Sequence, residues 1–369
     1  MSKQKPGGSI KKFQTCLDWM LQDRNDQSPI VVMVTQVDPD AIGGALVLTA
    51  MLEDMIEERG KKVSVLPLYC GGIGHPQNRA LFNRYDLGRR FGHVNTYSSP
   101  ISDRRLVLVD SSDLNDSRLP SALRGKHPAM IIDHHRSEAK PKGKEFYWIE
   151  DGSGDGVGSS STMVFELAHA RNFKIGDTEQ MLLALGIHND TKSLVDSTER
   201  DRLAFATLSA DIDGRKFSEL IRYPLPESYF SALSRALTEM RHVNERLVTN
   251  VGSIGLDDGD NISTIADFLL RMVGVTFVVV WGVVGKKVRL SLRSTDPSFS
   301  LTRFITESFG QNTGGAKMTP EGISEGGATV SLELPDWIDV EDEALEQCVE
   351  GMVSKAILGK VFPNNGNGK

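Results

Sequence analysis

Three short apolar runs in the first half of the chain each end directly at a polar segment. The runs cover residues 31–34, 106–109 and 130–132. They are apolar at every position and rich in valine, isoleucine and leucine, which is typical of strands buried on both faces. Residues 42–58 carry apolar side chains at helical spacing, and residues 62–68 are predicted to form a further strand. This alternation predicts an α/β fold with a doubly wound, mainly parallel sheet.

The polar segments after these runs carry carboxylates and imidazoles. Asp38 and Asp40 follow the first run, Asp110 follows the second, and the third continues into Asp133-His134-His135. Because the carboxyl ends of parallel strands meet at one edge of a sheet, we expect these side chains to converge. Carboxylate oxygens and imidazole nitrogens together suit Mn²⁺, Mg²⁺ or Zn²⁺. A further acid, Asp190, follows an apolar helix that is predicted over residues 178–186 with Thr178 as its cap, and it could project toward the same edge.

Each of these segments also has a simpler interpretation. Asp38 and Asp40 could be helix caps or turn acids, and Asp110 could cap the segment after it. The two histidines could lie in a solvated loop, and Gly186 could end a helix shortly before Asp190. The succession of four acid-bearing segments, three of them directly after apolar runs, favours a metal site over these separate interpretations.

The second half of the chain has a different pattern. Residues 211–228 are mixed and polar and include two prolines, which predicts a boundary, and residues 229–246 are predicted to form a connecting helix. The elements predicted after it are strands over 275–281 and 287–293 with a Gly285-Lys286 turn between them, a helix over 301–309, a glycine-rich loop over 310–327, a strand over 328–334 and a helix over 340–357. The expected division is a first domain over 1–213, a helical linker over 214–246, a smaller α/β domain over 247–361 and a disordered tail over 362–369.

Composition and charge narrow the classes of function. The net charge of −7 argues against a broadly basic surface and against an extended track for duplex DNA. Cys16, Cys70 and Cys348 are isolated and form no paired framework, so we expect reduced thiols and a cytoplasmic protein. The polar N-terminus lacks the apolar core of a signal peptide, and no apolar stretch is long enough for a membrane span.

The polar segments, taken in order, resemble the four motifs of the DHH phosphoesterases. The residues that carry the resemblance are Asp38-Pro39-Asp40-Ala41, Asp110, Asp133-His134-His135 and Asp190, and it extends from about residue 28 to about residue 335. The second half resembles the DHH-associated domain of the nanoRNase/pAp-phosphatase proteins and the RecJ nucleases. Gly314-Gly315-Ala316-Lys317 stands where that domain usually has Gly-Gly-Gly-His, and residues 71–78 are similar to a substrate-facing loop of the nanoRNase-like branch.

The resemblance implies two divalent ions, usually Mn²⁺, with Mg²⁺ or Co²⁺ as alternatives. By this resemblance Asp110 bridges both ions, Asp38 serves one of them, and His135 contacts the scissile phosphate. The other ion is completed by Asp40, His134 and Asp190. Two ions roughly 3.5–4 Å apart can clamp a phosphate and activate water, which agrees with this arrangement. The residues expected to bind substrate are His75, Asn78, Arg293, Ser294, Gly314, Gly315 and Lys317.

Arg293 is expected to end a strand that faces the glycine-rich loop. An arginine fork and exposed glycine N–H groups could together bind a phosphate. Alternatively, Arg289 and Arg293 lie four residues apart on one strand face and are simply its solvated side, an interpretation that suits Arg289 better than Arg293.

Two positions depart from the family pattern. The family usually has a histidine just before the first aspartate, whereas this chain has Val34 four residues before Asp38 and Gln36 two residues before it, and neither is a good ligand. The ion served by Asp38 would then be held weakly, or by water, Gln36 or another side chain such as His188. Lys317 replaces the histidine of the glycine loop; a lysine can meet a phosphate as a point charge but cannot reproduce a directional imidazole contact.

The leading expectation is a metal-dependent phosphodiesterase that hydrolyses short linear oligonucleotides or dinucleotides, such as pGpG or pApA, to mononucleotides. A cleft between the two domains would enclose such a substrate. Removal of a phosphate from pAp is a related activity. One alternative is a pyrophosphatase or polyphosphatase, and another is a degenerate nucleotide-binding protein without catalysis. A homodimer is a further expectation, and no membrane partner is expected.

Overall fold

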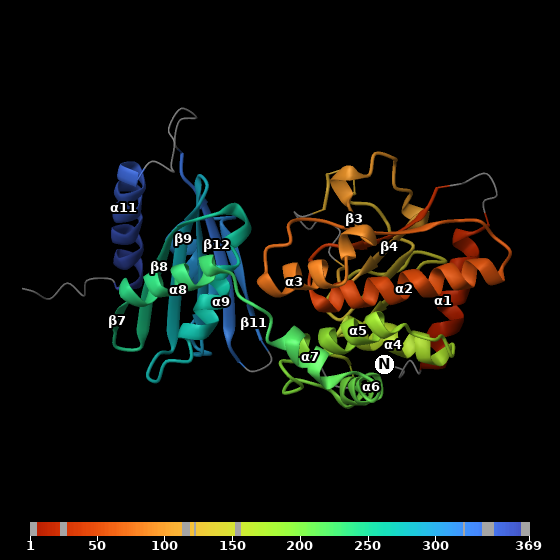
Figure 1. Ribbon diagram of the computed structural model, residues 1–369. Helices are drawn as coiled ribbons and strands as arrows, with labels where there is room; N and C mark the ends of the chain where they lie inside the picture. The colour runs from red at the N-terminus through yellow and green to blue at the C-terminus, as the bar shows by residue number, and fades with distance from the viewer. Residues whose placement is uncertain are drawn as a thin grey trace, which may run out of the picture. The chain divides into compact units, whose positions relative to one another are not determined.

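The computed structural model describes residues 6–22, 28–112, 119–121, 123–151, 156–319, 322–333 and 343–362 (Figure 1). The predicted tail from residue 363 onward and the predicted start of the last helix at 340–342 lie outside these ranges. The chain divides into two compact units, one formed by residues 1–73 and 77–223 and the other by 74–76 and 224–369. The domain limits expected at 213 and 246 stay predictions.

The first unit is built on a six-stranded parallel sheet. Its strands are β1 (Ile30–Val34), β2 (Val65–Tyr69), β3 (Gly92–His93), β4 (Leu106–Val109), β5 (Met130–Asp133) and β6 (Phe146–Ile149). They lie in the order β3-β2-β1-β4-β5-β6, and every neighbouring pair is parallel. The order reverses between β1 and β4, and in such sheets ligands bind beyond the carboxyl ends of the strands at this switch point. The predicted α/β class is therefore confirmed.

The central strands β1, β4 and β5 are buried on both faces of this sheet. The helices of the first unit are α1 (Pro6–Met20), α2 (Pro39–Glu58), α3 (Pro76–Arg84), α4 (Ser160–Ala170), α5 (Asp177–Asp190), α6 (Glu199–Ser209) and α7 (Gly214–Ile221). Alternate strand residues such as Val32 and Val107 share a core with α2, α4 and α5. Their neighbours Val31 and Leu108 share a second core with connecting segments that include Ile101. The same stretch of chain contains the short 3-10 turns η1 (Leu87–Arg89), η2 (Val94–Thr96) and η3 (Asp103–Arg105). Burial on both faces explains why these three strands are almost entirely apolar.

The second unit is a mixed sheet with two separate helix-covered cores. Its strands are β7 (Arg241–Val243), β8 (Arg246–Ile254), β9 (Phe277–Val284), β10 (Lys287–Ser294), β11 (Gly314–Met318) and β12 (Ser324–Ser331), in the order β11-β12-β10-β9-β8-β7. The other elements are α8 (Glu227–Thr238), the 3-10 turn η4 (Leu256–Asp258), α9 (Asn261–Leu269), α10 (Leu301–Phe309) and α11 (Glu343–Val361). One core joins the sheet to α8 and α9, and the other joins it to α10 and α11.

Several predicted elements are confirmed here and others are corrected. The β9–β10 hairpin turns at Gly285, whose φ of 57° suits glycine, and α10 covers the predicted residues. The helix predicted over 229–246 ends at Thr238, because the chain then turns into β7 and the long buried strand β8. The loop predicted over 310–327 contains β11 and the start of β12, and Gly315 of β11 pairs directly with Gly327 of β12.

The fifth helix also differs from its prediction. Thr178 is not its cap, since α5 begins at Asp177 after Gly176. Gly186 does not end the helix, because α5 continues to Asp190. Among the described residues, no helix combines the length and apolar character that crossing a bilayer requires.

Candidate metal centre

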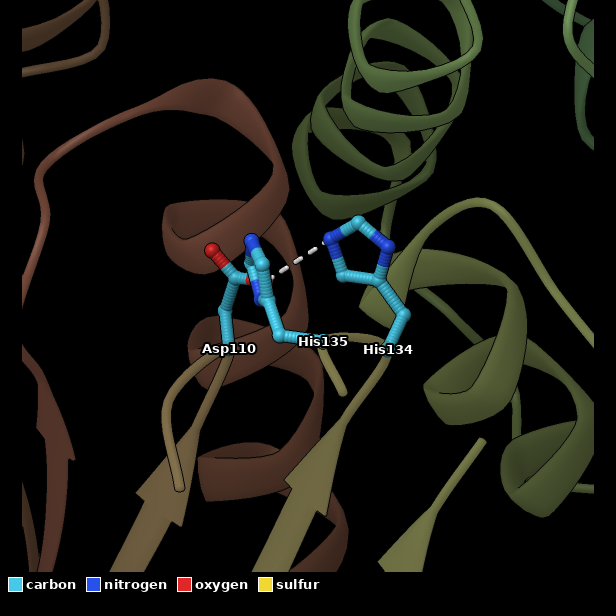
Figure 2. Close-up of side chains that lie close together, drawn as sticks. All are labelled: Asp110, His134 and His135. Atoms are coloured by element: carbon cyan, nitrogen blue, oxygen red, sulfur yellow. Dashed lines mark ion pairs between the residues drawn. The ribbon is translucent and has the colours of Figure 1, made fainter. Parts of the chain in front are cut away.

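The switch point of the first sheet gathers side chains from neighbouring strand ends. Asp110 follows β4, and His134 and His135 follow β5, with the side chains of Asp110 and His134 directed toward each other (Figure 2). The backbone N–H of Asp110 donates to the carbonyl of Ile132 at 2.9 Å, so Asp110 is still tied to the next strand. Its φ of 56° is left-handed, which turns the chain sharply out of β4 at this residue.

Four side chains converge closely enough to hold one metal ion. Single ligand atoms of Asp40, Asp110, His134 and Asp190 all lie within 4.8 Å of one another. The Nε2 atom of His134 is 3.1 Å from Asp190 Oδ2, 3.3 Å from Asp110 Oδ1 and 3.8 Å from Asp40 Oδ2. This nitrogen is buried and has no satisfactory hydrogen-bond partner in the described part of the chain. Three carboxylates around an orphaned imidazole nitrogen fit a divalent ion such as Mn²⁺.

The pKa values of three aspartates and of His134 show that burying several carboxylates close together is electrostatically unfavourable. Burial, followed by the neighbouring carboxylates, raises the pKa of Asp38 and Asp110 above the ordinary range and that of Asp190 to about 6. Burial alone would lower the pKa of His134, but its contacts with Asp110 and Asp190 outweigh burial and raise it well above its usual value. The cluster thus attracts positive charge, which a divalent cation supplies more fully than protons do.

Asp40 is held by the N-terminal turn of α4. It is fully buried, and its carboxylate accepts hydrogen bonds from the backbone N–H groups of Ser160 and Ser161, each at 2.8 Å, and from the hydroxyl of Ser159. Ser160 also donates its hydroxyl to Asp110 Oδ1 at 3.1 Å. A helix N-terminus stabilises an anion, so the turn is a favourable partner for a buried carboxylate and fixes its direction.

Helix α5 brings Asp190 to the group from its C-terminal end. Gly186 allows this approach, because a Cβ at that position would lie 2.5 Å from Ser161 Oγ and 2.7 Å from Asp40 Cα. The simpler interpretation of Gly186 as a helix terminator is therefore wrong, and close contact between α5 and the start of α2 takes its place.

His135 is held in a different way from His134. Asp133 is fully buried, and its Oδ1 accepts from the backbone N–H of His135 at 3.1 Å and contacts Nδ1 of the ring at 2.8 Å. This contact raises the pKa of His135, whose side chain is 53% exposed. Asp110, His134 and His135 form a second group with metal-binding geometry. The predicted contact of His135 with phosphate stays a prediction.

Asp38 lies outside the group of four. Its Oδ1 accepts from the backbone N–H of Ala41 at 2.9 Å and caps α2, which begins with Pro39. Val34, four residues before Asp38, is fully buried in β1. The helix-cap interpretation of Asp38 thus describes a real contact, and its predicted role for a second ion stays a prediction.

The residues expected to bind substrate lie in three different places in the structure. His75 is half-buried, and Asn78 is buried with its side-chain amide donating to the carbonyl of Val37. In the second unit, Ser294 lines a cavity of about 540 Å³. A different cavity of about 570 Å³ is lined by Arg289, Arg293, Gly314, Gly315 and Lys317 among others.

Arg293 is already engaged by neighbouring groups. It is buried, forms an ion pair with Asp267, and donates to Ser291 Oγ at 2.8 Å and to the carbonyl of Leu292 at 3.0 Å. It is therefore not part of a solvated strand face. A phosphate in this cavity would have to share the guanidinium with Asp267, so a substrate role for Arg293 stays a prediction.

Sequence reasoning missed the polar residues that hold the ligands. Neither the serine run Ser159-Ser160-Ser161 nor Asp201 is among the predicted site residues. A run of hydroxyl residues before an apolar helix is a usable signal for an anion-binding turn. The partner of that turn could not be found in the same way, because Asp40 lies more than a hundred residues earlier in the chain.

The fold and the site together define a class of protein. It is an α/β protein with a parallel sheet and, at the switch point of that sheet, a group of carboxylates and an imidazole that could hold a metal ion. Residues 29–187 match the model described as "DHH family, N-terminal domain". Residues 29–187 thus form a DHH-family domain, a family of metal-dependent phosphoesterases, and the resemblance seen in the first half of the sequence is confirmed.

Three further proteins are similar to the chain. Uncharacterized protein MJ1633 of Methanocaldococcus jannaschii is 25% identical over 353 residues, which cover 95% of this chain and 67% of the relative. A solved structure of an exopolyphosphatase-related protein from Bacteroides fragilis has a TM-score of 0.63 at 15% identity and matches over 98% of both chains. RecJ of Thermus thermophilus, solved with Mn²⁺, has a TM-score of 0.47 at 15% identity and matches 94% of this chain and 55% of RecJ. The Bacteroides fragilis structure confirms the fold over nearly the whole chain.

Proposed function

We propose that this chain is a Mn²⁺-dependent phosphodiesterase that hydrolyses short linear oligonucleotides or dinucleotides, such as pGpG or pApA, to mononucleotides, with pAp as a further substrate. The observation that carries the proposal is the convergence of Asp40, Asp110, His134 and Asp190 around the orphaned nitrogen of His134, within a DHH-family domain. Mg²⁺ or Co²⁺ could take the place of Mn²⁺ in the same donor set.

The four converging residues would hold the metal, and the remaining groups would act on the phosphate. When bound, a divalent ion supplies an activated water and compensates the charge of the phosphate. His135 keeps Nδ1 against Asp133, so its Nε2 is left to donate to a phosphate oxygen. Because the Asp133 contact raises the pKa of His135, the ring favours the cationic form that binds an anion.

The cavity of the second unit is our candidate for binding a nucleotide. Arg289 and Lys317 contribute cationic side chains, and Gly314 and Gly315 leave the β11 backbone accessible because they have no side chains. A small cavity of this kind suits one nucleotide rather than a long duplex. The chain's net charge of −7 also favours a short substrate over a long duplex, because a protein that binds duplex DNA needs many basic side chains to contact its phosphates.

The test is hydrolysis of 5′-phosphorylated pGpG and pApA by the metal-free protein before and after addition of Mn²⁺, with pAp and pyrophosphate assayed alongside. Release of mononucleotides that depends on Mn²⁺ is the expected result. Products should be separated by chromatography, so that mononucleotide release is distinguished from release of inorganic phosphate. No turnover of either dinucleotide with Mn²⁺ bound would contradict the proposal.

A pyrophosphatase or polyphosphatase is the second candidate. It is favoured by the similarity to the Bacteroides fragilis protein described as exopolyphosphatase-related. Phosphate release from pyrophosphate or polyphosphate alone would support it. A degenerate nucleotide-binding protein is favoured by Val34, which offers no ligand in the segment where the family usually has histidine. Such a protein would bind dinucleotides with no turnover.

A cytoplasmic location and a homodimer are also part of the proposal. Cys16 and Cys70 are buried thiols and Cys348 is an exposed one, which suits a reducing compartment. Size-exclusion chromatography with light scattering would test the homodimer.

A further inference from the structure

The N-terminal turn of α4 is hydrogen-bonded on two sides to buried carboxylates. On one side it donates to Asp40 and Asp110, as described above. On the other side it donates to Asp201 of α6, a residue that is fully buried and lies outside the metal-binding group. The turn, residues 158–162, therefore connects Asp201 to the metal-binding carboxylates through hydrogen bonds.

The contacts of Asp201 divide between its two oxygen atoms. Oδ1 accepts from the hydroxyl of Thr162 at 2.7 Å, and Oδ2 accepts from the backbone N–H of Gly158 at 2.9 Å. These bonds fix the turn at its beginning and at its end. The three serines between them, all fully buried, are the residues that reach the metal-binding carboxylates.

We propose that Asp201 is a positioning residue of the metal centre, which acts by locking the α4 turn so that Ser159, Ser160 and Ser161 hold Asp40 in the geometry of a metal ligand. This inference rests on the proposed function, because it assumes that the centre holds a divalent ion. Groups that orient a metal ligand from outside its coordination sphere commonly change metal affinity by roughly 10–100-fold when they are removed.

A purely structural role for Asp201 is the competing explanation. With Thr198 it forms the capping box of α6: Thr198 donates its N–H and its hydroxyl to Oδ2 at 2.9 and 2.8 Å, and the N–H of Asp201 donates back to the Thr198 hydroxyl at 3.3 Å. This box uses only Oδ2. The bond from the Thr162 hydroxyl to Oδ1 therefore has no part in capping α6, and the two roles can be separated by mutation.

The experiment measures the affinity of the full-length, metal-free protein for Mn²⁺ alone by titration calorimetry, together with its melting temperature in EDTA. Thr162→Val removes the Oδ1 bond and keeps the shape of the side chain. Ser159→Ala removes the direct hydroxyl contact with Asp40. Thr198→Ala is the matched control, because it removes the α6 cap from the same aspartate and leaves the α4 turn bonded. Thr162→Ser restores the hydroxyl and serves as the rescue.

We expect Thr162→Val and Ser159→Ala each to weaken Mn²⁺ binding by roughly 10-fold or more. Thr198→Ala should lower the melting temperature in EDTA but leave the Mn²⁺ affinity unchanged, and Thr162→Ser should bind Mn²⁺ like the parent protein. Equal Mn²⁺ affinity in the parent, Thr162→Val and Ser159→Ala proteins would overturn the positioning role while leaving the proposed function intact. A parent protein that binds no Mn²⁺ would overturn both.

Discussion

At the scale of single residues, Asp110 combines burial, shared contacts and an unfavourable backbone conformation. Its carboxylate contacts both Ser160 and His134, and its left-handed backbone costs free energy in most residues. Asparagine and aspartate tolerate this conformation better than other non-glycine residues. An aspartate at such a buried position, beside other carboxylates, indicates that the carboxylate charge itself is needed.

Asp110→Asn therefore tests the charge alone, because it replaces the carboxylate by a neutral amide of nearly the same shape. We expect it to reduce Mn²⁺-dependent hydrolysis by roughly 100-fold or more, since a substitution of this kind removes metal-centred stabilisation of the transition state. The melting temperature in EDTA should stay the same or rise, because burial and the neighbouring carboxylates both disfavour the charge that this substitution removes.

The matched control is Asp86→Asn. Asp86 is another aspartate with a left-handed backbone, φ 50°, but its side chain is exposed and forms an ion pair with Arg89 on the surface. Activity and melting temperature should both be unchanged in this variant. Asp110→Asn protein with activity close to the parent would show that Asp110 is not a metal ligand.

The candidate ligands could be predicted from the sequence because each follows a recognisable element. Asp110 and His134 come directly after apolar strands, and a parallel sheet brings strand ends to one edge. Asp201 gave no such signal. Its sequence context is that of an ordinary capping box, and only the folded chain brings it to Thr162.

At the scale of secondary-structure elements, the contact of α5 with α2 and α4 decides the geometry of the centre. Gly186 permits this contact, so a substitution of Gly186 tests it. Gly186→Ala would place a Cβ against Asp40 Cα and Ser161 Oγ, so the helices must move apart. We expect a loss of stability of about 1–3 kcal/mol and weaker Mn²⁺ binding, because overpacking displaces neighbouring backbone. Urea unfolding and Mn²⁺ titration would measure the two effects.

Gly351→Ala is the control for this prediction. Gly351 also lies inside a helix, α11, but a Cβ there meets no atom within 4 Å among the described residues. Alanine has the higher helix propensity, so this variant should gain roughly 0.5–1 kcal/mol and bind Mn²⁺ like the parent. Equal stability changes in the two variants would mean that close packing at Gly186 does not matter.

The elements that the sequence predicted well are those whose burial leaves a simple pattern. The strands β1, β4 and β5 are covered on both faces, so their positions are almost all apolar. β8 was missed because its polar residues Thr249 and Asn250 are buried inside the unit, a tertiary effect that composition does not reveal. The β11 strand was hidden by its glycines, which are normally a signal for a loop.

At the scale of the whole molecule, the chain has separate cores in its two units. Because each unit has its own core, we expect calorimetry to resolve two unfolding transitions. Mn²⁺ should raise only one of them, since a ligand stabilises the unit that binds it. The Asp110→Asn variant should lose this shift. A single transition that moves as a whole with Mn²⁺ would contradict independent unfolding.

The stability of the metal-free protein should also depend on pH in a direction that the centre determines. The pKa of Asp190 is about 6 in the folded chain against an ordinary value of 3.8, so between these values the folded state binds more protons than the unfolded state. The free energy of unfolding must then fall as pH rises from about 4 to 6. The raised pKa of His134 acts in the same direction, because its contribution is complete below 6.5 and is lost as pH rises through the higher folded value.

Bound Mn²⁺ should reverse this dependence, because the metal competes with protons for the same ligands and binds better as pH rises. We therefore expect urea unfolding in EDTA to show falling stability from about pH 4 to 6, and saturating Mn²⁺ to add more stability at the upper end of that range than at the lower. Asp190→Asn should flatten the profile in EDTA between these values, while Asp133, whose pKa is lowered, contributes only at lower pH. A metal-free profile that rises over this range in the parent protein would show that burial and the neighbouring carboxylates do not raise the pKa of Asp190 as the structure indicates.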